Sequence, residues 1–302
     1  MANTRDIKRR IKSVKNTKKI TGAMELVAAS KMKRAIDGAV LSRPYTKTLK
    51  DLSLVISNSV AAENMYAEET NHHGNNHQSS FEQSVLIVVV ASNRGLCGAY
   101  NTQIGRELGR FTRSVCQGKK CSYVTIGKKA DIIVKRMGGT LSASFHDLPE
   151  TVTVRSLQPI VRYIENAFKT GEFSAVRILY TEFKTALLQE VYVHQLLPVQ
   201  FNDNSTHVAT GQTVEQITYV IEPNPERVMQ ALTSRYMTSL LYQYVQESRA
   251  SEHSARMMAM RNAKDAADEM VEGLSLEYNK ARQAGITREI AEISAGQLAG
   301  QR

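Results

Sequence analysis

The distribution of proline constrains this 302-residue chain more than any other feature. All six prolines lie between residues 44 and 225, so the first 43 and the last 77 residues contain none. A proline in a helix interior removes a backbone hydrogen bond and clashes with the preceding turn. Both ends of the chain are therefore free to form helices that are much longer than those of an average globular domain.

The N-terminal end has the residue spacing of a coiled coil. Its apolar and small residues recur in steps that average close to 3.5, the period at which a narrow strip of side chains faces a partner helix. We expect a kink at Arg43-Pro44, after which the pattern resumes at Leu49, Leu52 and Ile56. At about 1.5 Å per residue, a helix from Thr4 to Ile56 is roughly 80 Å long. The positions expected to face the partner are Ile7, Ile11, Val14, Thr21, Met24, Ala28, Met32, Ala35 and Ala39.

The C-terminal end starts with a helix-initiation signal. The side chain of Asn224 suits an N-cap, and Pro225 suits the first helical position. A helix from there to about Leu298 would exceed roughly 100 Å. We predict that the two terminal helices pair antiparallel as a coiled coil that projects from a domain. The expected partner-facing positions, in steps of three and four, are Leu276, Asn279, Gln283, Ile286, Ile290 and Ile293.

The middle of the chain predicts an α/β domain over residues 84–222. An apolar run at 84–92 has the length and composition of a strand buried on both faces. Strand-like and helical segments then alternate, which indicates a Rossmann-like domain with a mainly parallel sheet, and the late consecutive strands suggest an antiparallel edge. We predict an N-terminal coiled-coil helix over 1–62, a flexible linker over 63–83, and a C-terminal coiled-coil helix over 223–302. The expected strands are 84–92, 121–127, 140–148, 174–183, 187–199 and 215–222, and the expected helices are 99–115, 128–137 and 157–169.

The positive charge belongs to one segment. Residues 1–50 contain 14 Lys and Arg against 3 Asp and Glu, whereas the other 252 residues contain 25 against 26. The whole chain has a formal net charge of +10. The basic segment therefore implies an acidic partner, which could be a nucleic acid, a membrane surface or an acidic protein surface.

Membrane spans, signals and disulfides are not expected from the sequence. The longest apolar run is Val85 to Ala91, far short of the roughly 20 residues that cross a bilayer. The N-terminus is charged from Arg5 onward without an apolar region, so we expect no secretory signal. Three cysteines do not make a disulfide framework, and they suggest a reducing compartment. Cys116 and Cys121 are read as surface thiols, with a redox pair as the alternative.

The sequence offers few candidate motifs for catalysis or ligand binding. The turn after the first strand, SNRGLCGAYN (Ser92 to Asn101), has the spacing G-x-x-G, which is not that of a dinucleotide or phosphate loop. It is read as a turn that serves packing or a partner, with a nucleotide site as the alternative. His72, His73 and His77 lie in the expected linker without companion Cys or carboxylate spacing, so a solvated loop is favoured over a metal site. We expect no catalytic residues, no cofactor and no metal, and read the chain as a mechanical part rather than an enzyme.

Three motifs resemble one family. NTKKITGAMELVAASKM (Asn16 to Met32) is similar to the N-terminal helix signature of the gamma subunit of F-type ATP synthases, and NKARQAGITREIAEISAGQLA (Asn279 to Ala299) resembles its C-terminal signature. SNRGLCGAYN resembles the central turn of that family. The order of helix, α/β domain and helix also agrees, so the resemblance covers nearly the whole chain.

The resemblance implies a rotor. In that family the coiled coil is inserted in a ring of three alpha and three beta subunits, and the α/β domain lies beside the epsilon subunit on the membrane ring of c subunits. Membrane association is then indirect, on the cytoplasmic face of the inner membrane in bacteria, which we favour over an organelle. Rotation driven by protons forces each beta subunit through its nucleotide states. The residues to which the resemblance assigns contacts with the ring are Met24, Arg94, Arg282, Gln283, Thr287, Ile286, Ile290 and Ile293.

Two rival functions follow from the same sequence. A nucleic-acid-binding coiled coil would use the basic N-terminal arm and predicts salt-dependent affinity. Its weakness is that the lysines surround the helix and no base-reading module follows, so we expect no nucleic acid. An α/β enzyme with helical dimerisation arms predicts nucleotide binding by the central domain, and the missing phosphate loop disfavours it.

Overall fold

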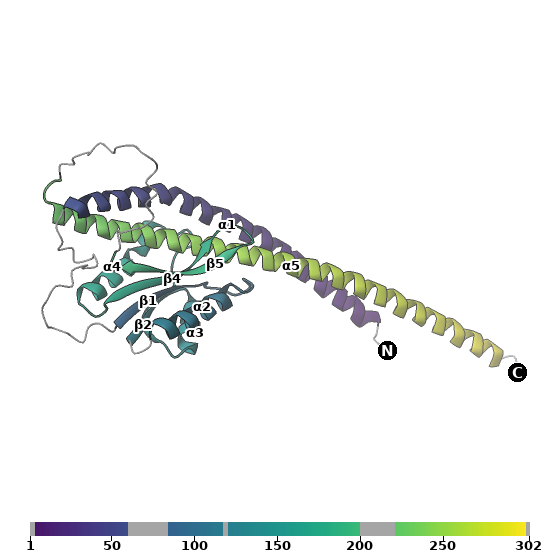
Figure 1. The fold of residues 1–302 in the computed structure, drawn as a ribbon. Coiled ribbons are helices and arrows are strands. Elements are labelled where there is room, and N and C mark those ends of the chain that lie inside the picture. Colours follow the sequence, from purple (N-terminus) through teal and green to yellow (C-terminus); the bar gives the residue numbers. More distant parts are fainter. Residues whose placement is uncertain (1–3, 60–83, 117–119, 200–220, 300–302) are drawn as a thin grey trace. The chain divides into compact units, whose positions relative to one another are not determined.

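The computed structural model describes residues 4–59, 84–116, 120–199 and 221–299 (Figure 1). These residues form five helices and five strands. They group into two units, of which the first contains Met1–Ser30 with Arg256–Arg302 and the second contains Lys31–Ala255. The two long helices, α1 (Thr4–Ser59) and α5 (Pro225–Ala299), each contribute residues to both units. The expected fold class, an α/β domain with long helices at both ends, is confirmed.

The second unit is built on a sheet. Its described strands lie in the order β3-β2-β1-β4-β5. The pairs β1–β2, β1–β4 and β2–β3 are parallel, whereas β4–β5 is antiparallel. The mainly parallel sheet with an antiparallel edge is therefore as predicted. The strands are β1 (Ser84–Val90), β2 (Lys120–Ile126), β3 (Thr140–Phe145), β4 (Ala175–Phe183) and β5 (Gln189–Leu197).

Both faces of the central strand β1 are buried. Val85, Ile87 and Val89 face one layer of the core, and Leu86, Val88 and Val90 face the other. Burying each such side chain stabilises the fold by about 1.5–3 kcal/mol. The continuous apolar run is thus explained by helices that cover both faces of the sheet.

The helices divide between the two faces. On one face α2 (Tyr100–Val115) and α3 (Lys128–Arg136) contribute Ile104, Leu108 and Val134 to the core. On the other face α4 (Val154–Lys169) packs through its apolar side, and it begins with a capping box formed by Thr153 and Ser156. Segments of α1 and α5 complete this second layer. The residues that they contribute include Leu49, Ile56, Met229, Met237, Leu241 and Val245.

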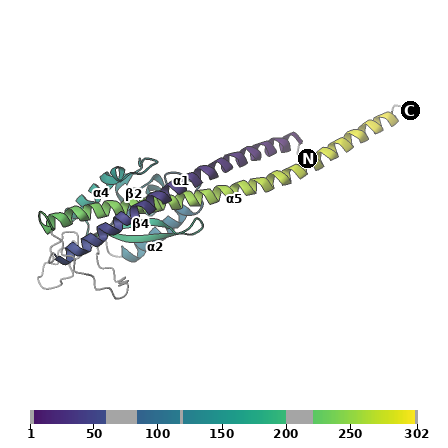
Figure 2. The ribbon, with the colours of Figure 1, turned by 90° about the horizontal axis from the view of Figure 1, so that it is seen from above.

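Within the second unit, α1 and α5 lie side by side, as both ribbon views show (Figures 1 and 2). The hydroxyl oxygens of Thr46 and Ser239 are 2.6 Å apart in a buried contact between the helices. The carboxylate of Glu247 is almost fully buried and accepts a hydrogen bond of 3.3 Å from Nη2 of Arg43. As predicted, α5 begins at Pro225, and the side chain of Asn224 caps it by accepting from the backbone N–H of Arg227 at 3.1 Å.

In the first unit the two helices run antiparallel. Nζ of Lys264 is 3.5 Å from Oε2 of Glu25, and Lys18 forms an ion pair with Asp268. The α1 residues expected to face a partner are confirmed as buried or partly buried here, and the same holds for Met32, Ala35 and Ala39 in the second unit. At about 1.5 Å per residue, the 56 residues of α1 and the 75 of α5 correspond to roughly 84 and 112 Å of helix.

Pro44 does not end α1. The structure keeps α1 as one helix through Pro44, where the sequence predicts a kink, and Pro44 lies on the solvent side. The carbonyl of Val40, which has no N–H donor at residue 44, belongs to an exposed residue that water can reach.

The expected linker 63–83, with its three histidines, and most of the expected strand 215–222 lie outside the described residues.

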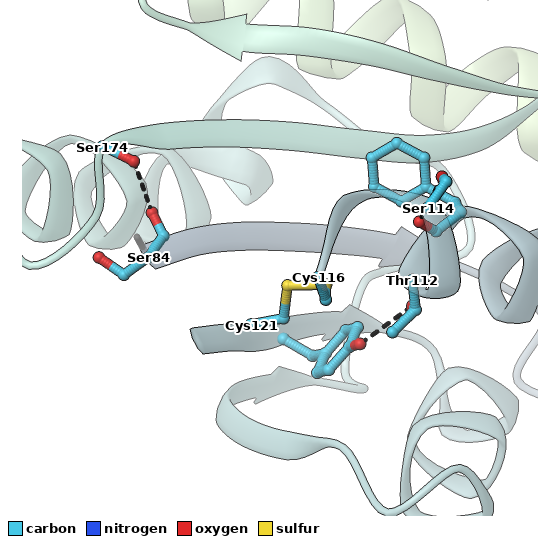
Figure 3. The surroundings of a disulfide bond; sticks show 8 residues. Ser84, Thr112, Ser114, Cys116, Cys121 and Ser174 are labelled. Atoms are coloured by element: carbon cyan, nitrogen blue, oxygen red, sulfur yellow. Dashed lines mark hydrogen bonds between the residues drawn. A yellow bond between two sulfur atoms is a disulfide. The ribbon is translucent and has the colours of Figure 1, made fainter. Parts of the chain in front are cut away.

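The prediction of separate surface thiols at Cys116 and Cys121 is wrong, because a disulfide joins them (Figure 3). Cys116 caps the C-terminus of α2, and Cys121 lies in β2. Their Cα atoms are 6.0 Å apart, within the range that a disulfide spans. Sequence spacing could not show that the end of α2 returns so close to the start of β2. Cys97 is buried and unpaired.

Candidate partner-contact surfaces

The C-terminal part of α5 extends beyond the described start of α1. The ion pair between Lys18 and Asp268 sets the antiparallel register. Moving back along α1 by the 14 residues from Lys18 to Thr4 advances α5 to about residue 282. The residues that follow in α5 therefore have no described α1 residue beside them.

The structure corrects which face of α5 meets α1. The partner-facing residues predicted for this helix, from Leu276 to Ile293, are exposed, and the exposed fractions of Ile286, Ile290 and Ile293 are 50, 59 and 64%. Another heptad phase of the same helix packs instead, because α1 selects one of two apolar strips. The residues on the packed face are Met260, Lys264, Ala267, Val271, Leu274, Tyr278 and Ala281.

This correction leaves a stripe of three isoleucines uncovered by the described chain. Ile286, Ile290 and Ile293 are spaced by four and three residues, so they lie on one side of α5. Large apolar side chains that gather on one exposed helix face mark a surface for another molecule. The stripe is therefore the strongest candidate contact surface in the first unit.

Polar candidates lie next to this stripe. Arg282, Gln283 and Thr287 are exposed on α5. The hydroxyl of Thr287 donates to the carbonyl of Gln283 at 3.0 Å within the helix, so its proton is already engaged. Across the described ranges, the side chain of Arg282 forms no ion pair, so its exposed guanidinium can meet a carboxylate of another molecule.

Met24 differs from the other candidates. It is partly buried at one of the α1 positions that face α5 in the first unit. Its thioether therefore contributes to packing within the pair of helices, and only its exposed portion remains for contact with another molecule. The structure does not group it with the isoleucine stripe.

The turn after β1 presents the remaining candidate, Arg94, which is exposed. Ser92 anchors the turn: its hydroxyl lies 2.7 Å from the carbonyl oxygen of Arg94 and 2.9 Å from Oδ1 of Asn101. Leu96 is exposed and has φ of 61°, a left-handed conformation that costs a bulky residue about 1 kcal/mol or more. An anchored turn that holds a large apolar side chain in water at this cost is suited to contact with a partner.

A polar cluster near this turn does not have the geometry of a catalytic triad. Nε2 of His146 is 2.7 Å from Oδ2 of Asp131 and 2.5 Å from Oγ of Ser144. In a triad, the serine and the carboxylate occupy different ring nitrogens of the histidine. Here both approach the same nitrogen, and Oγ of Ser144 is also 2.9 Å from both carboxylate oxygens. The cluster ties α3 to β3 and offers no activated hydroxyl.

Sequence reasoning missed a row of buried serines on α5. Ser248, Ser251 and Ser254 are almost inaccessible to solvent, although each lies in a helix interior. They recur at intervals of three residues, which is the signal that could have identified them as one face of a helix. Their partners, however, lie far away in the sequence.

The described residues contain neither a metal-binding cluster nor a membrane-spanning helix. In the part of the chain that the structure describes, no group of three or more His, Cys, Asp or Glu side chains is placed to hold a metal ion. Over the same residues, no helix is both long enough and apolar enough to span a bilayer.

Comparison with solved structures supports the fold. The chain superimposes on one from the Euglena gracilis mitochondrial ATP synthase (OSCP/F1/c-ring) with a TM-score of 0.64 and 19% identity, covering 98% of this chain and 94% of that chain. A chain of the Tetrahymena thermophila mitochondrial ATP synthase central stalk and c-ring gives a TM-score of 0.60 and 23% identity, covering 81% of this chain and 99% of that one.

Comparison of sequences is more specific. A family model described as ATP synthase matches residues 3–299. The ATP synthase gamma chain of Herpetosiphon aurantiacus is 40% identical over 305 residues, with 99% of each chain covered. That of Chloroflexus aurantiacus is 36% identical over 300 residues, again with 99% of each chain covered. Full-length identity at this level, together with the shared fold, shows that the chain belongs to the ATP synthase gamma chain family.

Proposed function

We propose that this chain is the central rotor shaft of an F-type ATP synthase, which couples ion-driven rotation of a ring of c subunits to the nucleotide states of the catalytic beta subunits. The observation that carries the proposal is the exposed isoleucine stripe on the part of α5 that has no α1 residue beside it. Membership in the gamma chain family supplies the context, and the solved neighbours include a central stalk with its c-ring.

The charge of α1 supports contact with an acidic ring of alpha and beta subunits. Its first part carries many exposed cations, whereas the ion pairs of the first unit use few of them. Exposed ion pairs contribute only about 0–1 kcal/mol each, so such contacts can break and re-form at every step. The exposed cations include Lys8, Arg9, Arg10, Lys12, Lys15 and Lys19.

Within this function we assign separate roles to the candidate residues. Ile286, Ile290 and Ile293 would lie in an apolar sleeve of the ring. Because the stripe is narrow, the sleeve would hold the helix without binding it as tightly as it would bind a broad apolar surface. Arg282 and Gln283, with Thr287, would meet the beta subunits, and Arg94 would do so from the turn after β1. Met24 would contact the ring with the exposed part of its side chain, at the edge of the helix pair. Rotation then depends on different contacts with successive beta conformations.

The chain would have no catalytic centre of its own and would act within the complex. Its proposed partners are the alpha, beta and epsilon subunits and the ring of c subunits. It would be a peripheral component on the cytoplasmic face of a bacterial inner membrane, as the bacterial gamma chain relatives suggest. We further propose the division into helix 1–62, linker 63–83, α/β domain 84–222 and helix 223–302.

Reconstitution tests this function. The full chain is mixed with alpha and beta subunits of a bacterial ATP synthase, and ATP hydrolysis is measured with and without it. We expect a stable complex and stimulated hydrolysis, because the shaft lets the beta subunits cycle in sequence. Absence of both incorporation and stimulation would reject the proposal.

A double substitution tests the contact residues. Arg282→Ala with Gln283→Ala should lower hydrolysis by the complex while assembly survives, since these exposed side chains do not support the helix pair. The matched control is Glu277→Ala with Lys280→Ala, which changes two exposed residues less than two turns earlier on α5. Equal rates of ATP hydrolysis in the two double variants would show that Arg282 and Gln283 transmit no torque to the beta subunits.

A further inference from the structure

The buried serine row of α5 lies at a distinctive place in the sheet. In the strand order β3-β2-β1-β4, the strands that follow β1 in the sequence lie on opposite sides of it. The crevice at the carboxyl ends of β1 and β4 is therefore a topological switch point. In open α/β sheets this crevice is the usual site for a bound ligand. In this chain, Ser248 hydrogen-bonds to residues from both sides of it, namely Tyr100 after β1 and Thr181 in β4.

The serine row forms hydrogen bonds with backbone groups of β4 that lie beyond its pairing with β1. β1 pairs with β4 only as far as Leu179, so Thr181 lies beyond the end of that pairing. The N–H of Thr181 donates to Oγ of Ser248 at 3.1 Å, and its carbonyl accepts from Oγ of Ser251 at 3.3 Å. The serines of α5 therefore take the place of a neighbouring strand at this residue.

Other contacts extend the attachment to three more segments. The hydroxyl of Tyr100, the first residue of α2, donates to the carbonyl of Ser248 at 3.1 Å. Oγ of Ser254 donates to the carbonyl of Ala186, in the turn between β4 and β5, at 2.6 Å. The guanidinium of Arg249 donates to the carbonyls of Pro149 and Glu150 at 2.9 and 2.6 Å. Six hydrogen bonds thus join four residues of α5 to four parts of the α/β domain.

These bonds resist rotation in a way that apolar packing does not. Earlier in α5, residues such as Met237 and Leu241 contact the sheet layer through apolar surfaces, which are non-directional. A serine oxygen lies about 4 Å from the helix axis, so turning α5 by about 15° moves it by about 1 Å. A hydrogen bond of about 3.1 Å would then exceed the normal range.

We propose that Ser248, Ser251 and Ser254 are positioning residues that lock α5 to the α/β domain and thereby pass torque between the domain and the helix. The inference rests on the proposed rotor function and adds to it the place where force enters α5. The three serines occupy the last turns of α5 in the second unit, because residue 256 already belongs to the first.

The test uses the triple variant Ser248→Ala, Ser251→Ala, Ser254→Ala in the complete membrane-bound complex. Alanine keeps the small size that close packing needs and removes the three hydroxyls. The control is Ser275→Ala, whose hydroxyl bonds within its own helix to the carbonyl of Val271. We expect the ratio of protons pumped to ATP hydrolysed to fall about two-fold or more in the triple variant, as for mutations along a coupling path. Ser275→Ala should leave the ratio unchanged.

The ratio separates torque transfer from general damage, because loss of assembled complex lowers pumping and hydrolysis together. An unchanged ratio in the triple variant would overturn the proposal. If the triple variant does not assemble, Ser248→Ala and Ser254→Ala are measured singly, and wild-type ratios in both would overturn it equally.

A second measurement is independent of the rotor function. Amide hydrogen exchange in the full chain should be faster at Thr181 when Ser248 is replaced by alanine. Faster exchange with a normal pumping ratio would show that the bond exists but transmits no torque. Failure of the wild-type chain to support any pumping would count against the rotor function itself.

Discussion

Replacing Tyr100 with phenylalanine should give a stability change that depends on pH. The side chain of Tyr100 is 3% exposed, and its hydroxyl donates to the carbonyl of Ser248 at 3.1 Å. Burial, reinforced by the negative charge of Glu252, raises the pKa of Tyr100 far above its ordinary value. At pH 8 both states are protonated, and removing the hydrogen bond should cost about 1 kcal/mol.

At alkaline pH the sign of the tyrosine contribution changes. An unfolded tyrosine loses its proton near pH 10, whereas the folded form of Tyr100 retains it because its pKa is raised. The unfolded state therefore binds fewer protons, and stability falls as the pH rises above about 10. At pH 11 this loss is about 1.4 kcal/mol for the wild type and is absent in the phenylalanine variant. The difference of about 1 kcal/mol expected at pH 8 should therefore vanish or reverse slightly at pH 11.

Urea unfolding of the full chain, followed by circular dichroism at pH 8 and pH 11, measures both differences. The control is Tyr45→Phe, which makes the same chemical change at an exposed position on α1 and should give the same small difference at both pH values. A destabilisation by Tyr100→Phe that is equally large at both pH values would refute the reasoning.

Three further substitutions have expected outcomes in urea unfolding. Gly22→Ala should stabilise the chain by up to about 1 kcal/mol, because a Cβ there would meet only Cδ of Lys264 at an ordinary 3.7 Å; destabilisation would contradict the packing of the first unit. Gly127→Ala should destabilise it by several kcal/mol, because φ is 99° and the new Cβ would lie 2.2 Å from the carbonyl oxygen of Ala91; a tolerated variant would show that this turn differs. Thr153→Ala should cost about 1 kcal/mol through loss of the N-cap of α4, and an effect near zero would refute the capping box.

Helix positions and the central strand were predictable because their signals are local. The absence of proline allows α1 and α5 to extend, and the 3.5-residue spacing correctly identifies the inward side of α1 from Ile7 to Ala39. Asn224 caps α5 because an N-cap depends on residues that are three positions apart. The continuous apolar composition of β1 likewise reports burial on both faces.

The candidate contact surfaces were predictable only in part. The residues from Arg282 to Ile293 were identified through a family resemblance, but the face of α5 that pairs with α1 was not. Two strips of that helix have heptad spacing, and both contain apolar residues. The choice between them depends on the free energy of packing against α1, which lies more than 200 residues away in the chain. Periodicity within one helix cannot supply that difference.

The amino-acid sequence alone determined the lengths of the terminal helices, the buried side of α1 and the alternation of strands and helices that makes a parallel sheet. These properties depend on steric and hydrophobic patterns within a few turns of the chain. Tertiary structure decided which strip of α5 stays exposed, how the end of α2 meets β2, and where the serine row finds its partners. The contact of Tyr100 with Ser248 joins residues 148 positions apart, and a buried hydroxyl is satisfied only when the whole fold brings its partner within reach.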